Sequence, residues 1–166
     1  METLLHNRVK VEALIEEHRP DAFGLSEAKL KREVDINDVS IKKTYTLHTA
    51  PTINNNNLNI SRIVVYTSNN VIAKRRHDLE DENLAVILLE VGLPRKKKFL
   101  LANIYREWKF MGQNDDTSAS IKAQLKRWNV FLDSWERALS EDKEVSLIGD
   151  VNLDFLKWKR NDLPPQ

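Results

Sequence analysis

Three residues that could do chemistry follow the apolar run at residues 145–148: Gly149, Asp150 and Asn152. The run itself predicts a buried strand. Asp150 and Asn152 are two residues apart, so their side chains share a face wherever the backbone stays extended. A carboxylate beside an amide can orient a water molecule and hold a phosphate oxygen. A strand that ends in an ordinary aspartate-capped turn has the same residues, so both interpretations stay open at this point.

A second acidic residue, Glu27, follows the short apolar run at residues 22–25. Ligands of α/β sheets bind just beyond the carboxyl ends of the strands. If this strand lies near the strand that precedes Asp150, and parallel to it, both carboxylates face one cleft. Carboxylate oxygens suit a hard divalent cation such as Mg²⁺, which keeps several waters and takes one or two carboxylates. A glutamate after a strand is common on protein surfaces, so Glu27 alone indicates little.

A third strand is predicted over residues 99–105, with Arg106 directly after it. Its alternation places Asn103 and Tyr105 on one face, and Leu100 and Ile104 on the other. Polar groups gathered at a strand end can line a pocket, although an ordinary amphipathic strand shows the same pattern.

The elements that must position these residues can be predicted from periodicity. Helices are expected over residues 4–18 and 118–139, and further strands over residues 44–49, 60–67, 71–73 and 85–91. Two hairpins are expected, one between residues 60–67 and 71–73 and one between residues 85–91 and 99–105. The polar segment at residues 29–38 is expected to be a loop.

The longer helix carries an apolar stripe with steps of three and four residues: Ile121, Leu125, Trp128, Leu132, Trp135 and Leu139. Such a stripe predicts packing against a sheet rather than a ligand site. In the first helix, Leu4, Val11, Leu14 and Ile15 lie near one face. Helices that cover sheets predict a layered α/β architecture.

The composition is that of an ordinary globular domain. The 166 residues include 41% hydrophobic and 31% charged residues, no cysteine and a net charge of +1. Disulfides and thiolate metal sites are therefore excluded, and no apolar stretch is long enough for a membrane span. Because no global charge attracts nucleic acid, any contact with DNA needs local clusters such as residues 74–76 or 95–98. These basic runs can equally be solvated turns.

Taken in chain order, the motifs resemble the endonuclease/exonuclease/phosphatase superfamily, whose members include apurinic endonucleases and DNase I. Within it, the chain is most similar to the endonuclease domain of non-LTR retrotransposons, because of Tyr105-Arg106-Glu107-Trp108 and the tryptophan-rich helix before Gly149. The motifs are Leu25-Ser26-Glu27, Ser61-Arg62-Ile63-Val64-Val65-Tyr66, Asn103-Ile104-Tyr105-Arg106 and Gly149-Asp150-Val151-Asn152.

The resemblance implies a DNase I-like fold, a four-layer α/β sandwich of two mixed sheets flanked by helices, of which this chain supplies a part. It implies hydrolysis of a DNA phosphodiester with Mg²⁺ or Mn²⁺ held by Glu27. Asp150 would orient the attacking water, while Asn152 and Tyr105 would contact the phosphate or the leaving group. Asn103 and Arg106 are weaker candidates for phosphate contacts.

The resemblance also shows what this sequence lacks. Residues 1–166 are expected to form a single incomplete domain without the family's first strand and its C-terminal Ser-Asp-His element. None of the four histidines follows an aspartate, so little turnover is expected. The family further implies an intracellular, nuclear location and a reverse transcriptase domain in the same parent polyprotein. The alternatives are a phosphatase or phosphodiesterase acting on a smaller substrate, and a non-catalytic DNA-binding remnant.

Overall fold

The computed structural model describes residues 4–31, 36–41, 44–53, 59–81, 84–105 and 118–151. Its elements are, in order, α1 (Leu4–His18), β1 (Ala22–Leu25), β2 (Leu30–Lys31), α2 (Ile36–Val39), β3 (Tyr45–Ile53), β4 (Asn59–Ser68), β5 (Ile72–Arg75), β6 (Ala85–Gly92), β7 (Phe99–Tyr105), α3 (Ser118–Leu139) and β8 (Val145–Asp150). The bounds of both long helices agree with those predicted from periodicity.

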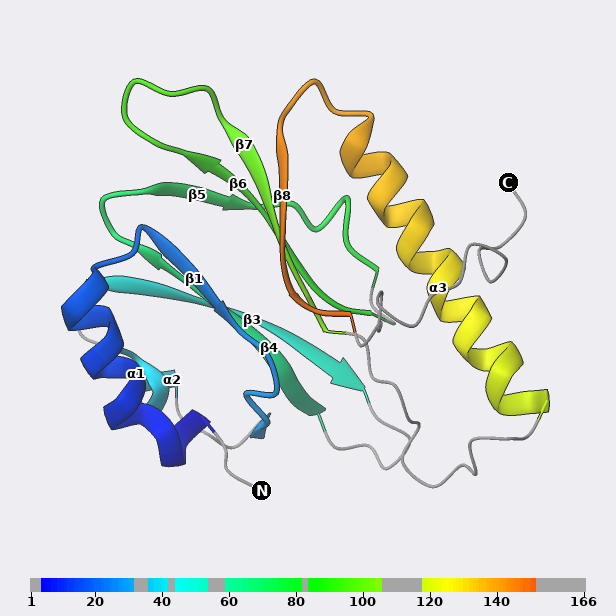
Figure 1. Ribbon diagram of the computed structural model, residues 1–166, viewed down its shortest axis with the longest axis horizontal. Helices are drawn as coiled ribbons and strands as arrows, with labels where there is room; N and C mark the ends of the chain where they lie inside the picture. The colour runs from blue at the N-terminus through cyan, green and yellow to red at the C-terminus, as the bar shows by residue number, and fades with distance from the viewer. Residues whose placement is uncertain are drawn as a thin grey trace.

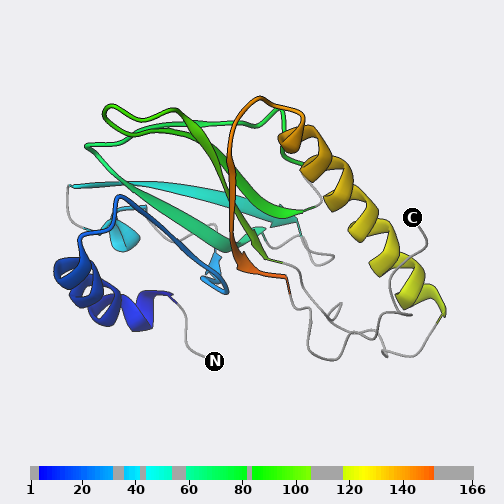
Figure 2. The same cartoon turned by 45° about the horizontal axis from the view of Figure 1, so that its top comes forward.

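Two sheets face each other, and helices cover their outer sides (Figure 1). In the first sheet, the central strand β4 pairs antiparallel with β1, β2 and β3. In the second sheet the order is β5-β6-β7-β8, with β7 and β8 parallel and the other pairs antiparallel. Figure 2 shows α1 beside the first sheet and α3 beside the second, which gives four layers. Among the described strands only the second sheet is mixed, whereas two mixed sheets were expected.

Alternation along the central strands builds this sandwich. Ile63 and Val65 of β4 and Ile87 and Leu89 of β6 are fully buried between the sheets. The intervening residues of β4, Val64 and Tyr66, pack towards α1. Burial of each such side chain contributes about 1.5–3 kcal/mol. Because both faces of these strands are buried, their sequences are nearly continuous apolar runs.

The second sheet is anchored to α3 in the same way. Val86, Leu88, Leu100 and Ala102 on its outer face pack with Ala138, and Trp135 lies against them. Of the predicted stripe, Trp135 packs against the sheet, whereas the described residues that α3 buries are Phe131, Ser134 and Ala138, which the stripe did not include. The last member of the stripe, Leu139, is 55% exposed, because it lies off the face that carries Phe131, Ser134 and Ala138. Side chains at the N-terminal end of the stripe lie outside the described residues.

Two local predictions were wrong. β5 does not form a hairpin with β4: Ile72 pairs with Gly92 of β6, so the turn after β4 carries the chain from one sheet to the other. The segment at residues 29–38, expected to be a loop, contains β2 and the short helix α2. The apolar residues Leu30 and Val39 are buried there against α1, and this tertiary burial outweighs the polar composition. No helix within the described ranges is both long and apolar enough for a bilayer crossing.

Candidate functional site

The hydroxyl of Tyr105 donates a hydrogen bond of 2.9 Å to Oε1 of Glu27. Tyr105 is the last residue of β7, in the second sheet, and Glu27 follows β1, in the first. The contact therefore closes the end of the sandwich between the two sheets. It joins two residues that the sequence singled out as possible members of one site.

Backbone strain directs the Glu27 side chain. Glu27 and Lys29 have φ values of +55° and +50°, a left-handed conformation that costs a residue with a side chain about 1 kcal/mol. Between them Ala28 is buried, and its N–H donates a 2.8 Å hydrogen bond to the carbonyl of Arg62 in β4. This anchor holds the loop against the central strand. Strained residues held in place by surrounding structure are typical of functional sites.

Two cations flank the carboxylate. Nζ of Lys29 lies 3.4 Å from Oε2 of Glu27, and the guanidinium carbon of Arg62 lies 6.0 Å from the centre of the Tyr105 ring. The hydrogen bond from Tyr105 lowers the pKa of Glu27, and Lys29 and then Arg62 lower it further, against an opposing effect of burial. Glu27 is therefore an ionised acceptor at neutral pH, available to a cation.

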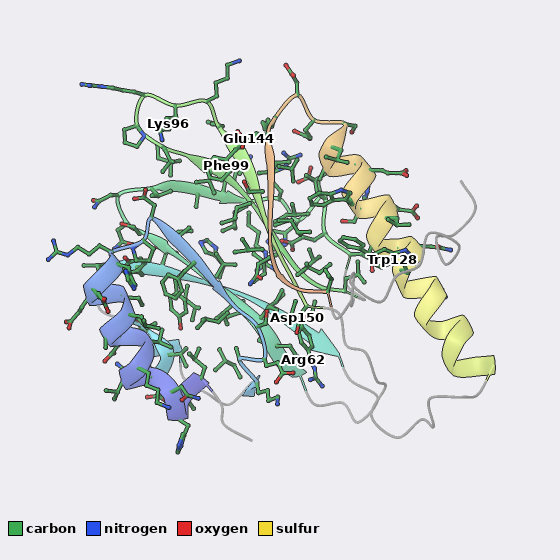
Figure 3. The ribbon with its side chains drawn as sticks, in the orientation of Figure 1. Arg62, Lys96, Phe99, Trp128, Glu144 and Asp150 are labelled. Carbon is green, nitrogen blue, oxygen red and sulfur yellow. The ribbon has the colours of Figure 1, made fainter. Side chains whose placement is uncertain are left out.

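Asp150 lies beside Tyr105, because the two residues are paired in the parallel β7–β8 ladder. Neighbouring strands are about 4.8 Å apart, so the exposed Asp150 carboxylate and the Tyr105 phenol belong to one rim. Figure 3 shows Asp150 and Arg62 at this end of the sheets and Lys96 at the opposite end. The structure thus brings Glu27, Tyr105 and Asp150 together, while their chemical roles stay predictions.

The reason for this convergence differs from the one expected. From the sequence, the two carboxylates would share a cleft if the strands before Glu27 and Asp150 were parallel neighbours, but β1 and β8 belong to different sheets. Tyr105 links them instead, by its hydrogen bond to Glu27 and its ladder pairing with Asp150. Asp150 is also the last residue of β8 rather than part of a turn beyond it.

Gly149 is required by the close approach of β7. Its φ is +114°, and a Cβ built on it would lie 2.0 Å from the carbonyl oxygen of Ile104. Only glycine fits such a position without displacing the neighbouring backbone. The glycine before Asp150 is therefore explained by backbone packing and not by a turn.

Asn103 does not lie where a substrate phosphate would reach it. Its side chain is fully buried, and Nδ2 donates a 3.1 Å hydrogen bond to the carbonyl of Val64. Its Oδ1 has no hydrogen-bond partner among the residues that the structure describes, which costs roughly 1–3 kcal/mol for a buried polar group. The predicted phosphate contact at Asn103 is therefore not supported by its position. Asn152 and Arg106 lie outside the described residues.

Sequence reasoning did not single out Lys29 or Arg62 as members of the site. Arg62 directly precedes the apolar run Ile63-Val64-Val65, and the motif that contains it was noted in the sequence without a role for the arginine. Lys29 lies two residues from Glu27 in a polar segment and has no distinguishing pattern.

The donors at this rim fit a hard divalent cation. Glu27 and Asp150 offer two carboxylates, and Mg²⁺ takes one or two while keeping several waters. Within the described ranges there is no group of three or more histidine, aspartate or glutamate side chains arranged to hold a metal by themselves. Water and substrate oxygens would therefore complete the coordination.

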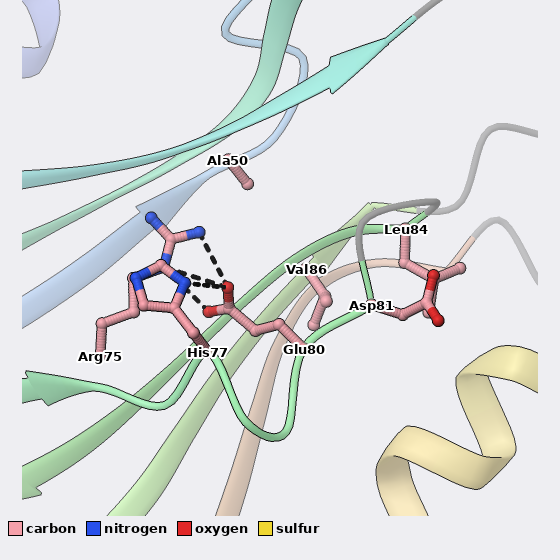
Figure 4. A pocket seen from close by; sticks show the side chains of 7 residues that line it. All are labelled: Ala50, Arg75, His77, Glu80, Asp81, Leu84 and Val86. Atoms are coloured by element: carbon pink, nitrogen blue, oxygen red, sulfur yellow. Dashed lines mark hydrogen bonds and ion pairs between the residues drawn. The ribbon is translucent and has the colours of Figure 1, made fainter.

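A pocket of about 480 Å³ lies outside this rim (Figure 4). Nε and Nη2 of Arg75 each donate a 3.0 Å hydrogen bond to the carboxylate of Glu80, and Nδ1 of His77 lies 3.3 Å from it. Glu80 also accepts a 2.8 Å hydrogen bond from the N–H of Leu88. These charges neutralise one another and tie β5 to β6. None of the predicted site residues that the structure describes lines this pocket.

No protein-family model and no curated protein matches the sequence. The chain matches a structure of the 3′ phosphatase NExo from Neisseria bound to product DNA hairpin, with a TM-score of 0.63 and 14% identity. It also matches the 3′-5′ exonuclease NExo from Neisseria meningitidis, with a TM-score of 0.64 and 15% identity. Each match covers 91% of this chain and 55% of the other, so the chain spans about half the length of these proteins. The predicted fold class is confirmed: the chain has a DNase I-like α/β fold.

Proposed function

We propose that the rim formed by Glu27, Tyr105 and Asp150 binds and hydrolyses phosphate esters of DNA in the presence of Mg²⁺ or Mn²⁺. The observation that carries this proposal is the Tyr105–Glu27 hydrogen bond beside Asp150, which joins the ends of both sheets at one point. The NExo structures support it, because proteins of the same fold are described as a 3′ phosphatase and a 3′-5′ exonuclease.

Each side chain has a role that its geometry allows. The ionised Glu27 would hold the divalent cation, which would stabilise negative charge on the phosphate and on the leaving oxygen. With substrate bound, the single O–H of Tyr105 would turn from Glu27, to which it donates in this structure, to a phosphate oxygen or to the leaving group, and Asp150 would accept a proton from the attacking water. Arg62, held over the Tyr105 ring, binds the non-bridging oxygens of the phosphate. Asn152 and Arg106 are further phosphate contacts in this proposal.

DNA is the proposed substrate because a neighbour of the same fold is bound to a DNA hairpin. The motif order favours an endonuclease of the non-LTR retrotransposon type, encoded with a reverse transcriptase and acting in the nucleus. The printed sequence contains no Ser-Asp-His element that could supply a catalytic histidine and aspartate. We therefore expect slow turnover by these 166 residues, since removal of part of a catalytic unit costs orders of magnitude in rate.

A second candidate is the hydrolysis of a terminal phosphate monoester. Lys29 and Arg62 place two cations beside Glu27, and a monoester carries nearly two negative charges at neutral pH where a diester carries one. One of the neighbours is described as a 3′ phosphatase. The two candidates share every residue of the site and differ only in the charge of the substrate.

The test compares two substrates under single-turnover conditions with Mg²⁺: a supercoiled plasmid, scored for nicking, and an oligonucleotide with a 3′-phosphate, scored for release of phosphate. Preference for the plasmid supports the endonuclease, and preference for the oligonucleotide supports the phosphatase. Asp150→Ala should abolish either activity, and Lys96→Gln, at the opposite end of the sheets, should leave it unchanged. Activity that survives Asp150→Ala contradicts the assignment. Salt-dependent DNA binding without turnover would identify a binding remnant.

A further inference from the structure

Asn103 forms a polar contact across the interior of the sandwich. It lies on β7, in the second sheet, and its Nδ2 donates to the carbonyl of Val64 on β4, the central strand of the first sheet. Its side chain is fully buried, so the contact is screened from water. A hydrogen bond in such surroundings sets the separation of the two sheets at this point more sharply than apolar contacts do.

Two further strands approach the same side chain through glycines. A Cβ added to Gly24 of β1 would lie 2.8 Å from both Cγ and Nδ2 of Asn103. A Cβ added to Gly149 of β8 would lie 2.8 Å from Oδ1 of Asn103. The backbones of both strands therefore lie directly against the amide, in space that any other residue type would fill.

These contacts lie just before the site residues on each strand. Gly149 directly precedes Asp150, Gly24 is three residues before Glu27, and Asn103 itself is two residues before Tyr105. We infer that Asn103 is a positioning residue of the site, which holds β1, β4 and β8 against β7 so that Glu27 and Asp150 lie on either side of Tyr105. The inference rests on the proposed function in so far as these three residues act together.

The unpartnered Oδ1 favours this role over simple filling of the core. A leucine has the same branched skeleton of heavy atoms and would leave no buried polar atom unpaired. The amide offers what leucine lacks, a donor directed at a single backbone oxygen. Its planar end is also thin enough to fit between two glycine backbones.

The first test is amide hydrogen exchange followed by NMR in the full chain. The variant is Asn103→Leu, and the matched control is Thr67→Val. Thr67, on β4, is another buried polar residue, and its hydroxyl lies 3.1 Å from Nε2 of His48. Thr67→Val likewise replaces a buried polar side chain with an apolar one of similar shape. The reporter amides are that of Ala28, which donates to the carbonyl of Arg62, and those of the β7–β8 ladder.

We expect Asn103→Leu to accelerate exchange at the reporter amides at least tenfold relative to the remaining amides of β4 and β6. Thr67→Val should accelerate exchange at the reporter amides only as much as at the remaining amides of β4 and β6, because it lowers the stability of the whole fold. A uniform acceleration by both variants would show that Asn103 is only part of the core. Asn103→Ser, which removes the amide with a smaller side chain, serves as the variant if Asn103→Leu does not fold.

A second measurement needs no variant. The Nδ2 protons of Asn103 in the unmodified chain should exchange at least a hundredfold more slowly than those of exposed asparagines such as Asn69. Exchange at the rate of exposed amides would overturn the inference, because the hydrogen bond to Val64 would then not persist in solution.

Kinetics separate this inference from the proposed function. If the chain hydrolyses DNA, Asn103→Leu should lower kcat at least tenfold and change KM less than twofold, because substrate still binds while the catalytic groups are displaced. Thr67→Val should change neither by more than twofold. If the unmodified chain shows no hydrolysis, the proposed function fails, and the exchange measurements still decide the role of Asn103.

Discussion

The phenol of Tyr105 bonds to the carboxylate of Glu27 across 78 residues of sequence and between two different sheets. This hydrogen bond is the largest influence that lowers the pKa of Glu27. It favours the ionised form of Glu27 and joins the two sheets at this point.

Tyr105→Phe should raise the pKa of Glu27 towards its ordinary value, since the hydrogen bond that stabilises the carboxylate is removed. A ¹³C NMR titration of the Glu27 carboxyl measures this change. Tyr45→Phe is the control, because the Tyr45 hydroxyl donates to the carbonyl of Pro20 and not to Glu27. An unchanged Glu27 pKa in Tyr105→Phe would show that the hydrogen bond does not persist in solution.

The same hydrogen bond predicts a pH dependence of stability. A carboxyl whose pKa is lower in the folded than in the unfolded state stabilises the fold fully above its unfolded-state pKa. That contribution is lost as the pH falls through the folded-state pKa. The free energy of unfolding should therefore decrease less on acidification in Tyr105→Phe than in the unmodified chain. Urea unfolding at a series of pH values measures the difference, which should be small because Glu27 is largely exposed.

Gly149→Ala should destabilise the protein by roughly 2–4 kcal/mol, because φ is +114° and the added Cβ would overlap the carbonyl oxygen of Ile104. Gly92→Ala is the matched control, since its Cβ would meet neighbours at 3.7 Å and 3.8 Å, in ordinary contact. Its effect should stay within about 1 kcal/mol. Urea unfolding measures both, and equal losses would contradict the close approach of β7 and β8 at Gly149.

Arg76 links the end of β5 to the segment after α3. Its Nη2 lies 2.6 Å from Oε1 of Glu141 and 2.5 Å from Oδ2 of Asp78, and these contacts lower the pKa of each carboxyl to about 2. Arg76→Met should raise both values towards the ordinary range in an NMR titration. Lys143→Met should affect Glu141 less and Asp78 not at all, because Lys143 is the weaker partner of Glu141. If Lys143→Met raises the pKa of Glu141 more than Arg76→Met does, this ranking is wrong.

The binding constant for DNA falls as the salt concentration rises, and the slope of this fall on a log–log plot reports the number of phosphate contacts. Arg62→Met should lower the steepness of this slope by about one, because one phosphate contact is lost. Binding of a DNA duplex measured at several salt concentrations gives this slope. Lys96→Met is the control: Lys96 lies on the β6–β7 turn, and the length of β7 places that turn about 20 Å from Tyr105. If Lys96→Met reduces the slope equally, the basic turn also contacts DNA, and its interpretation as a solvated turn is wrong.

Much of the fold could be predicted because its determinants are local. The spacing of apolar residues placed α1 and α3 at residues 4–18 and 118–139, and alternation with the turn after residue 92 predicted the β6–β7 hairpin. Glu27, Tyr105 and Asp150 were identified because each carries a polar group at or near the end of an apolar strand. Such patterns record which side of an element faces a core, and this needs only neighbours in the sequence.

The pairing of strands and the interior contacts were decided only by the tertiary structure. β5 has the pattern of a hairpin partner of β4, yet it lies in the other sheet, because the twist and packing of whole sheets select its partner. Asn103 has the pattern of a pocket-lining residue, yet β1, β4 and β8 bury it completely. Sequence alternation tells on which face a side chain lies. Which strands then cover that face depends on contacts between residues far apart in the chain, whose free energy exists only once both sheets have formed.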